Sequence, residues 1–389
     1  MKVLVFTHLF PSRRQPTAAP FSLHTYRALA RRCELRLVAP TPWWIRLREA
    51  PRELWTPVHE LHGGIEARYP TYLSLPRVHR LHALGLRLSL GRSLAALRRS
   101  FPFDAILAAW AYPDTAAAAA FARRFSVPLV TTVLGSDITA LSEDPALRPQ
   151  IVAALRPCAR VVAVSADLGE RVAALGIPRD RIVVVRNAVD GERFTIRDRE
   201  HARVRLGLPI GAPLILYAGY LVPEKGVDIL VDAMAVLPRR DVHLVMLGDG
   251  PLRRSLRSRV RSRGLADRVH LRGAVPPEAV PEFMAACDLL CLPSRREGCP
   301  NVVLEALASG RPVVASRVGG VPELVRDDES GVLVAPDDPA ALAAGLARAL
   351  ARPWDPAALR RTVGALSWDP IGDRYHELLR EAVAAARAG

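Results

Sequence analysis

Lysine is almost missing from this sequence. Of its 54 basic residues only Lys2 and Lys225 are lysines, and the rest are arginines. The two residue types are nearly interchangeable on a solvated surface, but lysine supplies a compact point charge where arginine supplies a planar fork. Lys225 is therefore a candidate for a functional ammonium group, with the chance survival of a surface lysine as the alternative.

Other features that mark particular protein classes are also missing. No apolar run approaches the roughly 18 residues of a membrane span, and Met1–Thr7 lacks the apolar region and cleavage site of a signal peptide. The five cysteines have no metal-type spacing, so we expect packed, reduced thiols and no metal site. We therefore expect a cytoplasmic protein.

Acidic residues are missing between Glu66 and Asp104, a segment that holds seven arginines. Leu81, Leu84, Leu88 and Leu94 recur there near helical spacing, as in a basic amphipathic helix. One interpretation is contact with an anionic membrane surface, on the inner face of the membrane, and the other is a solvated helix that packs its leucines on the core. The residues expected to touch the membrane are Trp43, Trp44, Arg80, Arg87 and Arg92. Nucleic-acid binding is not predicted, because the charge comes with no recognition motif.

Short β-branched runs alternate with helical stretches along the whole chain, which predicts α/β structure with parallel sheets. The expected strands of the first series are Val3–Thr7, Glu34–Ala39, Ile106–Ala109, Leu129–Val133, Val161–Val164 and Ile182–Val185. Those of the second series are Leu214–Ala218, His243–Leu247, Val269–Leu271, Leu289–Leu292, Val313–Ala315 and Val332–Val334. The two series predict two Rossmann-like domains, residues 1–195 and 196–369, with a last helix in 370–389 that packs back on the first domain.

The residues that could bind a ligand or take part in a reaction lie in loops that follow strands, since ligands of such sheets bind beyond the carboxyl ends of the strands. The turn from Gly219 to Gly226 contains Lys225 and opens a helix at Val227, which suits a phosphate group. An ordinary turn with a solvated lysine is the alternative.

A second such loop runs from Pro293 to Asn301 and precedes a helix expected over 302–308. Amides near the helix start would face an anion, and Glu297 and Glu305 could accept hydrogen bonds from sugar hydroxyls. Helix capping and the helix dipole would also explain Asn301 and Glu305.

Glu297 and Glu305, with seven residues between them, resemble the two-glutamate motif of retaining glycosyltransferases of the family 4 type, which have the GT-B fold. Further matching segments follow in the same order, as far as Val318–Glu323. They include Asn187–Asp190, Val222–Asp228 and Leu247–Pro251. The resemblance implies two Rossmann-like domains that face each other across a cleft, with a nucleotide diphosphate-sugar as co-substrate, no cofactor, and a glycan or lipid-linked acceptor, as in cell-surface polysaccharide or glycolipid synthesis.

The resemblance also implies roles for single residues. Lys225 would neutralise the diphosphate, Glu297 would contact the transferred sugar, and Glu305 would bind the ribose. The donor would also meet Gly219, Tyr220, Gly248, Gly250, Gly298, Cys299, Pro300 and the amides of Asn301, Val302 and Val303. Asp137 is expected to take part in catalysis, and the acceptor side would comprise His8, Ala19, Gly135, Asp137, Ser165 and Asn187.

Three segments depart from the family pattern. Tyr220 stands where the family commonly has arginine, Leu134 where many members have histidine, and Ala18 and Ala19 where a glycine-rich loop is expected. Arg295 or Arg296 is a candidate to replace the missing guanidinium. The rival hypotheses are a sugar-nucleotide epimerase, a phosphorylase, or a catalytically silent partner subunit that binds a nucleotide-sugar or a membrane.

Overall fold

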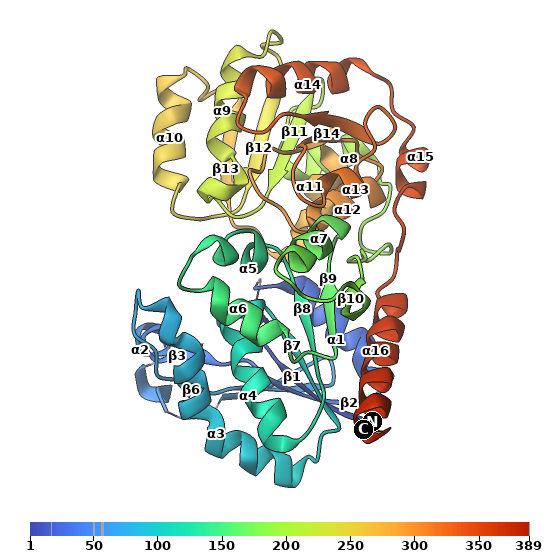
Figure 1. Ribbon diagram of the computed structural model, residues 1–389. Coiled ribbons are helices and arrows are strands. Elements are labelled where there is room, and N and C mark those ends of the chain that lie inside the picture. The colour runs from blue at the N-terminus through green and yellow to red at the C-terminus, as the bar shows by residue number, and fades with distance from the viewer. Residues whose placement is uncertain (17, 50, 56–57, 389) are drawn as a thin grey trace. The chain divides into compact units, whose positions relative to one another are not determined.

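The computed structural model describes residues 1–16, 18–49, 51–55 and 58–388. The chain forms two compact units, residues 1–187 with 368–389 and residues 188–367, called here the N-terminal and C-terminal domains. Both are α/β units around a sheet that is wholly or mostly parallel (Figure 1), as the alternating sequence pattern predicts.

The N-terminal sheet has the strand order β10-β9-β8-β7-β1-β2-β5-β4. Its strands are β1 (Lys2–Phe6), β2 (Glu34–Val38), β4 (Val58–His62), β5 (Ile65–Tyr69), β7 (Ala105–Ala109), β8 (Leu129–Val133), β9 (Arg160–Ala163) and β10 (Ile182–Val184). β7 and β8 are buried along their whole length, which explains why neither contains a charged residue. Two further short strands, β3 (Thr41–Pro42) and β6 (Thr71–Tyr72), pair in parallel and form a separate two-stranded sheet.

The antiparallel pair β4–β5 at the sheet edge is absent from the sequence prediction. Its polar residues, such as Glu60 and Arg68, conceal the strands, because only alternate side chains are buried. The turn Gly63-Gly64 between them is a recognised hairpin signal that the prediction did not use.

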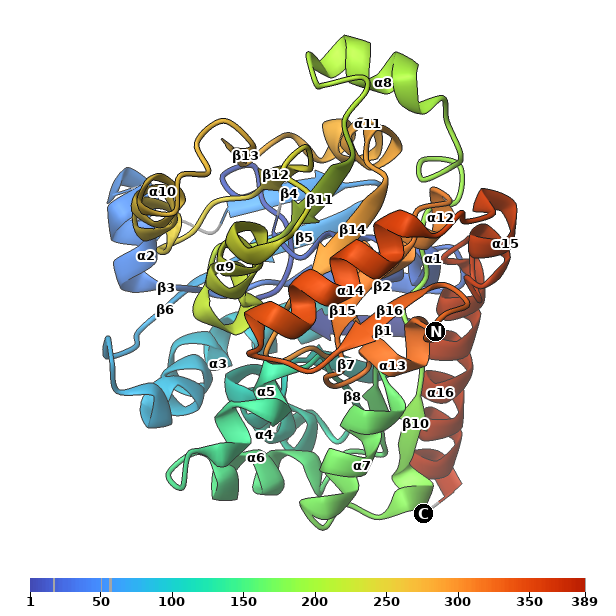
Figure 2. The ribbon, with the colours of Figure 1, turned by 90° about the horizontal axis from the view of Figure 1, so that it is seen from above.

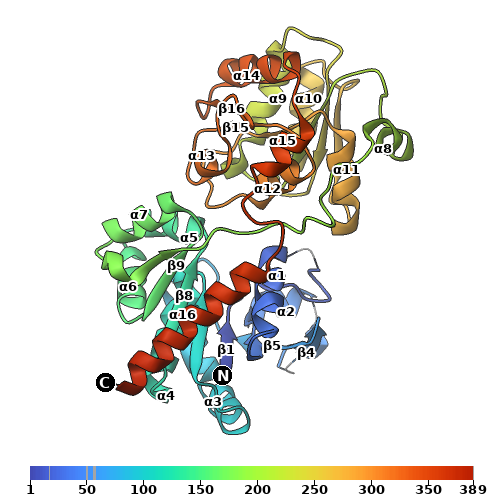
Figure 3. The ribbon, with the colours of Figure 1, turned by 90° about the vertical axis from the view of Figure 1, so that its right-hand side faces the viewer.

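Helices cover the N-terminal sheet. They are α1 (Pro20–Ala30), α2 (Trp43–Glu49), α3 (His82–Ser100), α4 (Ala116–Phe125), α5 (Ser136–Thr139), α6 (Arg148–Leu155), α7 (Ala166–Ala174) and α16 (Asp369–Ala388). The predicted return of the last helix is confirmed: α16 lies against α1 and along the sheet (Figure 3). Tyr375, Leu378 and Leu379 enter the N-terminal core, and the main chain at Gly372 lies so close to Ala28 that a Cβ would be 2.6 Å from its carbonyl carbon.

The C-terminal sheet is parallel throughout, in the order β13-β12-β11-β14-β15-β16. The strands are β11 (Leu214–Ala218), β12 (His243–Leu247), β13 (Val269–Gly273), β14 (Leu289–Leu292), β15 (Val313–Ser316) and β16 (Gly331–Val334). All six expected strands are present, with β13 longer than expected at its carboxyl end. Reading β11 as the first strand, this order is 3-2-1-4-5-6, the arrangement of a Rossmann sheet.

Two apolar cores flank the C-terminal sheet. One contains side chains from α9 (Val227–Val236), α10 (Arg253–Ser262) and α14 (Pro339–Ala351), which lie on one face of the sheet (Figure 2). The other contains side chains from α8 (Arg199–Leu206), α11 (Val280–Ala286), α12 (Asn301–Ala308) and α13 (Val321–Leu324), together with α15 (Pro356–Arg361). The polar loops at the carboxyl ends of the strands are thus held by strands and helices that are rigidly packed on both faces.

Candidate functional site

The switch point of the C-terminal sheet lies between β11 and β14, which are neighbours in space but far apart in the sequence. The connections from these strands leave in opposite directions, so their loops, 219–226 and 293–300, meet at the carboxyl edge. The loops are in direct contact, because the amide of Arg295 donates a 2.8 Å hydrogen bond to the carbonyl of Glu224. The tertiary structure thereby brings together the two loops that the sequence singled out separately.

Lys225 and Glu297 form the centre of this region. The Nζ atom of Lys225 lies 2.7 Å from Oε1 of Glu297, and the hydroxyl of Ser294 donates to the same oxygen at 2.6 Å. Glu297 is buried, whereas the Lys225 side chain is 30% exposed. An ammonium group that is fixed by a buried carboxylate and still open to solvent is suited to bind a phosphate oxygen.

Glycines let the main chain of neighbouring loops approach closely around this pair. A Cβ at Gly319, where φ is +50°, would lie 2.0 Å from the carbonyl oxygen of Glu297. A Cβ at Gly248, where φ is +129°, would lie 1.9 Å from the carbonyl oxygen of Gly219. Side chains cannot be accommodated at such distances, so both glycines are needed to hold the loops in place.

Helix α12 points its N-terminus toward the same edge of the sheet. Pro300 occupies the cap position and no side chain caps the helix, while the Val303 amide donates to the Pro300 carbonyl at 3.1 Å. The helix begins at Asn301, one residue before the predicted start, and no acidic residue lies in its first turn, so the helix dipole does not explain Glu305. Partial positive charge at this terminus favours an anion.

Glu305 is partly buried in α12. Burial raises the pKa of Glu305 to about 7, and the positive charge of Arg193 acts in the opposite direction. A carboxyl with this pKa changes its charge near neutral pH, so it can serve either as hydrogen-bond donor or as acceptor.

Arg295 does not replace the guanidinium that the family commonly has after Gly219. Its Nη1 and Nη2 atoms each lie 3.0 Å from one carboxylate oxygen of Asp228, and Asp337 binds the Nε atom. These two carboxylates hold the pKa of Arg295 above its ordinary value. Tyr220 is 67% exposed and its carbonyl accepts a 2.8 Å hydrogen bond from the Tyr217 hydroxyl.

The remaining predicted donor residues follow the carboxyl ends of three strands, β11, β12 and β14. Gly219 directly follows β11, and Gly250, with φ of +158°, packs against the main chain of Leu221. Gly298 is buried and Cys299 is partly exposed in the loop that leads to α12, and Val302 is also partly exposed. No observation assigns a ligand to any of them, so their donor roles remain predictions.

The N-terminal sheet has its own switch point, between β1 and β7. His8 follows β1 and Asp114 follows β7, and their side chains meet with Nδ1 of His8 2.6 Å from Oδ2 of Asp114. The His8 amide donates to the same oxygen at 2.9 Å. Burial lowers the pKa of His8, but the charge and hydrogen bond of Asp114 outweigh it, so the pKa is raised. The sequence pointed to His8 and missed Asp114, although Asp114 also follows a predicted strand.

Asp137 has a different environment from the one its predicted catalytic role requires. Its side chain is fully buried, and it accepts hydrogen bonds from the amides of Ala111 at 2.9 Å and Gly135 at 2.8 Å. A further bond comes from the Leu134 amide at 3.1 Å. Burial raises the pKa of Asp137 while these amides lower it, with a net upward shift. In this structure Asp137 ties the loops after β7 and β8 together and is closed to a substrate.

The other predicted acceptor residues lie at the ends of elements in the N-terminal domain. Ala19 precedes α1 with φ of +42°, the left-handed conformation that glycine adopts most easily, so the backbone keeps the glycine-type geometry without a glycine. Gly135 precedes α5, and Ser165 caps α7 by accepting from the Leu168 amide at 3.2 Å. Asn187 is the last residue before the C-terminal domain.

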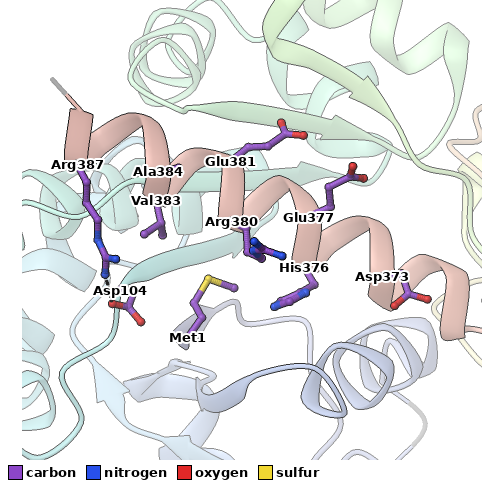
Figure 4. Close-up of a pocket in the computed structure, with 10 residues that line it drawn as sticks. All are labelled: Met1, Asp104, Asp373, His376, Glu377, Arg380, Glu381, Val383, Ala384 and Arg387. Atoms are coloured by element: carbon purple, nitrogen blue, oxygen red, sulfur yellow. Dashed lines mark hydrogen bonds and ion pairs between the residues drawn. The ribbon is translucent and has the colours of Figure 1, made fainter.

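Depressions in the surface of the N-terminal domain lie at both edges of its sheet. A small one of about 130 Å³ lies at the carboxyl ends of β1 and β2, where His8, Arg14, Glu60 and Tyr69 line it. A wider one of about 900 Å³ runs along α16 between Met1 and Asp104 (Figure 4). The wide depression lies at the amino ends of β1 and β7, the edge opposite to the ligand edge of such sheets, and its acidic and basic side chains are mixed.

Within the described ranges, no three or more histidine, cysteine, aspartate or glutamate side chains are grouped as a metal site would need. None of the helices in the described part of the chain combines the length and apolar character of a membrane span. The cysteines in the structure are free thiols, in agreement with the sequence.

The fold and the site define a GT-B protein. The family model described as Glycosyl transferases group 1 matches residues 212–352, and that of Glycosyltransferase Family 4 matches residues 18–193. A D-inositol 3-phosphate glycosyltransferase of Thermomonospora curvata is 34% identical, over 69% of this chain and 70% of the relative. The chain belongs to the glycosyltransferases of the family 4 type.

Other similar proteins match over different shares of their length. The D-inositol 3-phosphate glycosyltransferase of Geodermatophilus obscurus is 36% identical over 64% of this chain, and the match spans 60% of that relative. A putative teichuronic acid biosynthesis glycosyltransferase, TuaC of Bacillus subtilis, is 28% identical over 90% of this chain and 89% of the relative. The solved structure of Anabaena HepE in complex with UDP has a TM-score of 0.76 at 21% identity and covers 98% of this chain and all of that one.

Proposed function

We propose that this protein is a retaining glycosyltransferase that moves a sugar from a nucleotide diphosphate-sugar to a glycan or lipid-linked acceptor in cell-surface polysaccharide or glycolipid synthesis. One observation carries the proposal: the ammonium of Lys225 meets the buried carboxylate of Glu297 at the switch point of a parallel sheet. A cation for phosphate and a carboxylate for sugar hydroxyls thus share one ligand edge.

The proposed chemistry depends on the diphosphate. When the nucleoside diphosphate leaves, negative charge develops on its β-phosphate, and Lys225 with the amides of α12 would stabilise that charge. In the retaining reaction the attacking hydroxyl lies on the same face of the sugar as the phosphate, which can take its proton. This route needs no protein general base, in keeping with the closed environment of Asp137. We propose that it also proceeds without a metal ion.

The donor nucleotide and the acceptor enter the proposal from relatives. The Anabaena protein was solved with UDP and with UDP-glucose, which supports a uridine nucleotide as first candidate. The names of two relatives point to D-inositol 3-phosphate or to an intermediate of teichuronic acid biosynthesis as acceptor. We propose a cytoplasmic enzyme that works at the inner face of the membrane, where lipid-linked acceptors lie.

The test is to measure thermal shift and nucleotide release with a panel of nucleotide-sugars. Lys225→Ala and Glu297→Ala should lose donor-dependent stabilisation, and each should lower turnover by about 10²- to 10³-fold. Lys2→Ala is the matched control, because it removes the same charge from the N-terminal domain. The absence of binding to every donor would refute the proposal.

A silent nucleotide-sugar-binding subunit is the second candidate function. It is favoured by one observation, Tyr220, which is exposed where the family commonly has an arginine. Donor binding without turnover, with membrane extracts supplied as acceptor, would decide for this candidate.

A further inference from the structure

Helix α3 has two apolar stripes rather than one. Its buried stripe contains Leu86, Leu90 and Leu94, and Leu94 is only 2% exposed. Leu84 and Leu88 lie on the other side of the helix and are 45% and 75% exposed. Packing on the core therefore explains Leu94 but leaves Leu84 and Leu88 in contact with solvent, although exposed leucines on one helix face are costly to leave hydrated.

The segment before α3 adds two more exposed leucines, Leu73 and Leu75. The main chain at Leu73 is fixed to α3, because the Leu73 amide donates a 3.0 Å hydrogen bond to the Ser89 hydroxyl. Its carbonyl packs so closely on the helix that a Cβ at Gly85 would lie 2.0 Å from the oxygen. These two contacts hold the segment that carries Leu73 and Leu75 against α3, beside the turns that carry Leu84 and Leu88.

The charge around these leucines is of one sign. Arg87 and Arg92 are exposed on α3, and no carboxylate in the described ranges lies within ion-pair distance of either one. The nearest acidic residues in the sequence are Glu66 and Asp104, and each already binds an arginine elsewhere. Leucines bordered by unpaired arginines are complementary to a surface that is apolar inside and anionic at its boundary.

The tryptophans expected to anchor the protein are held by the domain itself. The indole Nε1 of Trp43 donates to the Ser74 carbonyl at 2.8 Å, and that of Trp44 donates to the Ser74 hydroxyl at 3.2 Å. The ring of Trp44 is still partly open to solvent, and its bond to Ser74 places it next to the segment that carries Leu73 and Leu75.

We propose that this Leu–Arg surface docks on an anionic lipid bilayer. It consists of Leu73, Leu75, Leu84, Leu88, Arg87 and Arg92. The leucines enter the boundary of the acyl chains and the arginines bind lipid phosphates. Access to a lipid-linked acceptor, the purpose of this contact, rests on the proposed function. Binding of these side chains to a bilayer can be tested without any sugar donor.

The test uses the full chain and sedimentation with vesicles of phosphatidylcholine alone or mixed about equally with phosphatidylglycerol. Wild type should bind the mixed vesicles only. The exposed pair Leu84→Ser with Leu88→Ser should lower the partition coefficient at least tenfold, and Arg87→Gln with Arg92→Gln should lower it about fivefold for each arginine. The controls are Val204→Ser with Val236→Ser, which removes exposed apolar side chains from the C-terminal domain, and Arg254→Gln with Arg257→Gln, which removes the same charge there.

Each result has a defined meaning. A selective loss in the leucine and arginine variants, with binding of UDP unchanged by thermal shift, supports the proposal. The proposal is overturned if the protein does not bind anionic vesicles. It is also overturned if the Arg254 and Arg257 control lowers binding as much as the Arg87 and Arg92 variant does while the leucine variant binds like wild type. Self-association that the leucine variant abolishes, without vesicle binding, would assign the surface to a second copy of the chain and also overturn it. A failure of the proposed function would be visible separately, as a loss of UDP binding in a protein that still sediments with vesicles.

Discussion

The pKa of Glu305 makes the stability of the C-terminal domain depend on pH. Burial raises this pKa from 4.5 to about 7. Because the folded pKa is above the unfolded one, the contribution of Glu305 is fully favourable below about pH 4.5 and is lost as the pH rises through about 7. Each pKa unit corresponds to about 1.4 kcal/mol, so the loss amounts to roughly 3 kcal/mol.

The perturbation is Glu305→Gln, which keeps the shape of the side chain and removes its charge. The free energy of unfolding of both proteins is measured by urea denaturation from about pH 4.5 to about pH 8. The stability of wild type relative to the variant should fall by roughly 3 kcal/mol over this range. Glu224→Gln, an exposed carboxylate of the same domain, is the matched control. A difference between wild type and Glu305→Gln that stays constant with pH would refute the reasoning.

Three other predictions follow from the same geometry. Gly319→Ala should lower UDP affinity at least tenfold, because the added Cβ would displace the main chain of Glu297. Gly364→Ala is the control, since no atom lies near its Cβ, and its UDP affinity should be unchanged. Equal affinities of the two variants by calorimetry would contradict this. His8 should titrate above its ordinary value of 6.5 in an NMR pH titration, and Asp114→Asn should shift its pKa downward, since the carboxylate raises it against the effect of burial; an unchanged midpoint would remove the electrostatic account. Asp228→Ala should cost about 1 to 3 kcal/mol in urea unfolding by leaving the half-buried Arg295 without its two-point partner, and Arg295→Met in that background should recover part of the loss.

Much of the donor half was predictable from the sequence. The central strands of both sheets are largely apolar runs bounded by polar loops, because strands that are buried on both faces leave little room for charged side chains. The residues after those strands, Lys225 and Glu297 among them, were therefore identified as site candidates before their contact was known. The Rossmann-like prediction for the second series of strands implies the order 3-2-1-4-5-6, and with it a switch point where the loops after β11 and β14 meet.

Other features required coordinates. Asp114 and Ser294 follow strands or lie in loops like many polar residues, and only the 2.6 Å contacts distinguish them as partners of His8 and Glu297. Asp137 is predicted as a catalytic group, but it is buried and bound by main-chain amides. One of these amides belongs to Ala111, which is distant in the sequence, so the residues next to Asp137 do not reveal this environment.

The sequence by itself determined the fold class, the carboxyl-edge loops and the chemical types at the donor site, since these depend on local apolar patterns and on short motifs. The tertiary structure alone decided which charges are paired and which side of a helix meets solvent. Arg295 is bound by Asp228 and Asp337, and Leu94 is buried whereas Leu84 and Leu88 are exposed. The physical reason is that desolvation and ion pairing depend on neighbours that are distant in the sequence, and helical spacing alone cannot tell which of two leucine stripes will face the core.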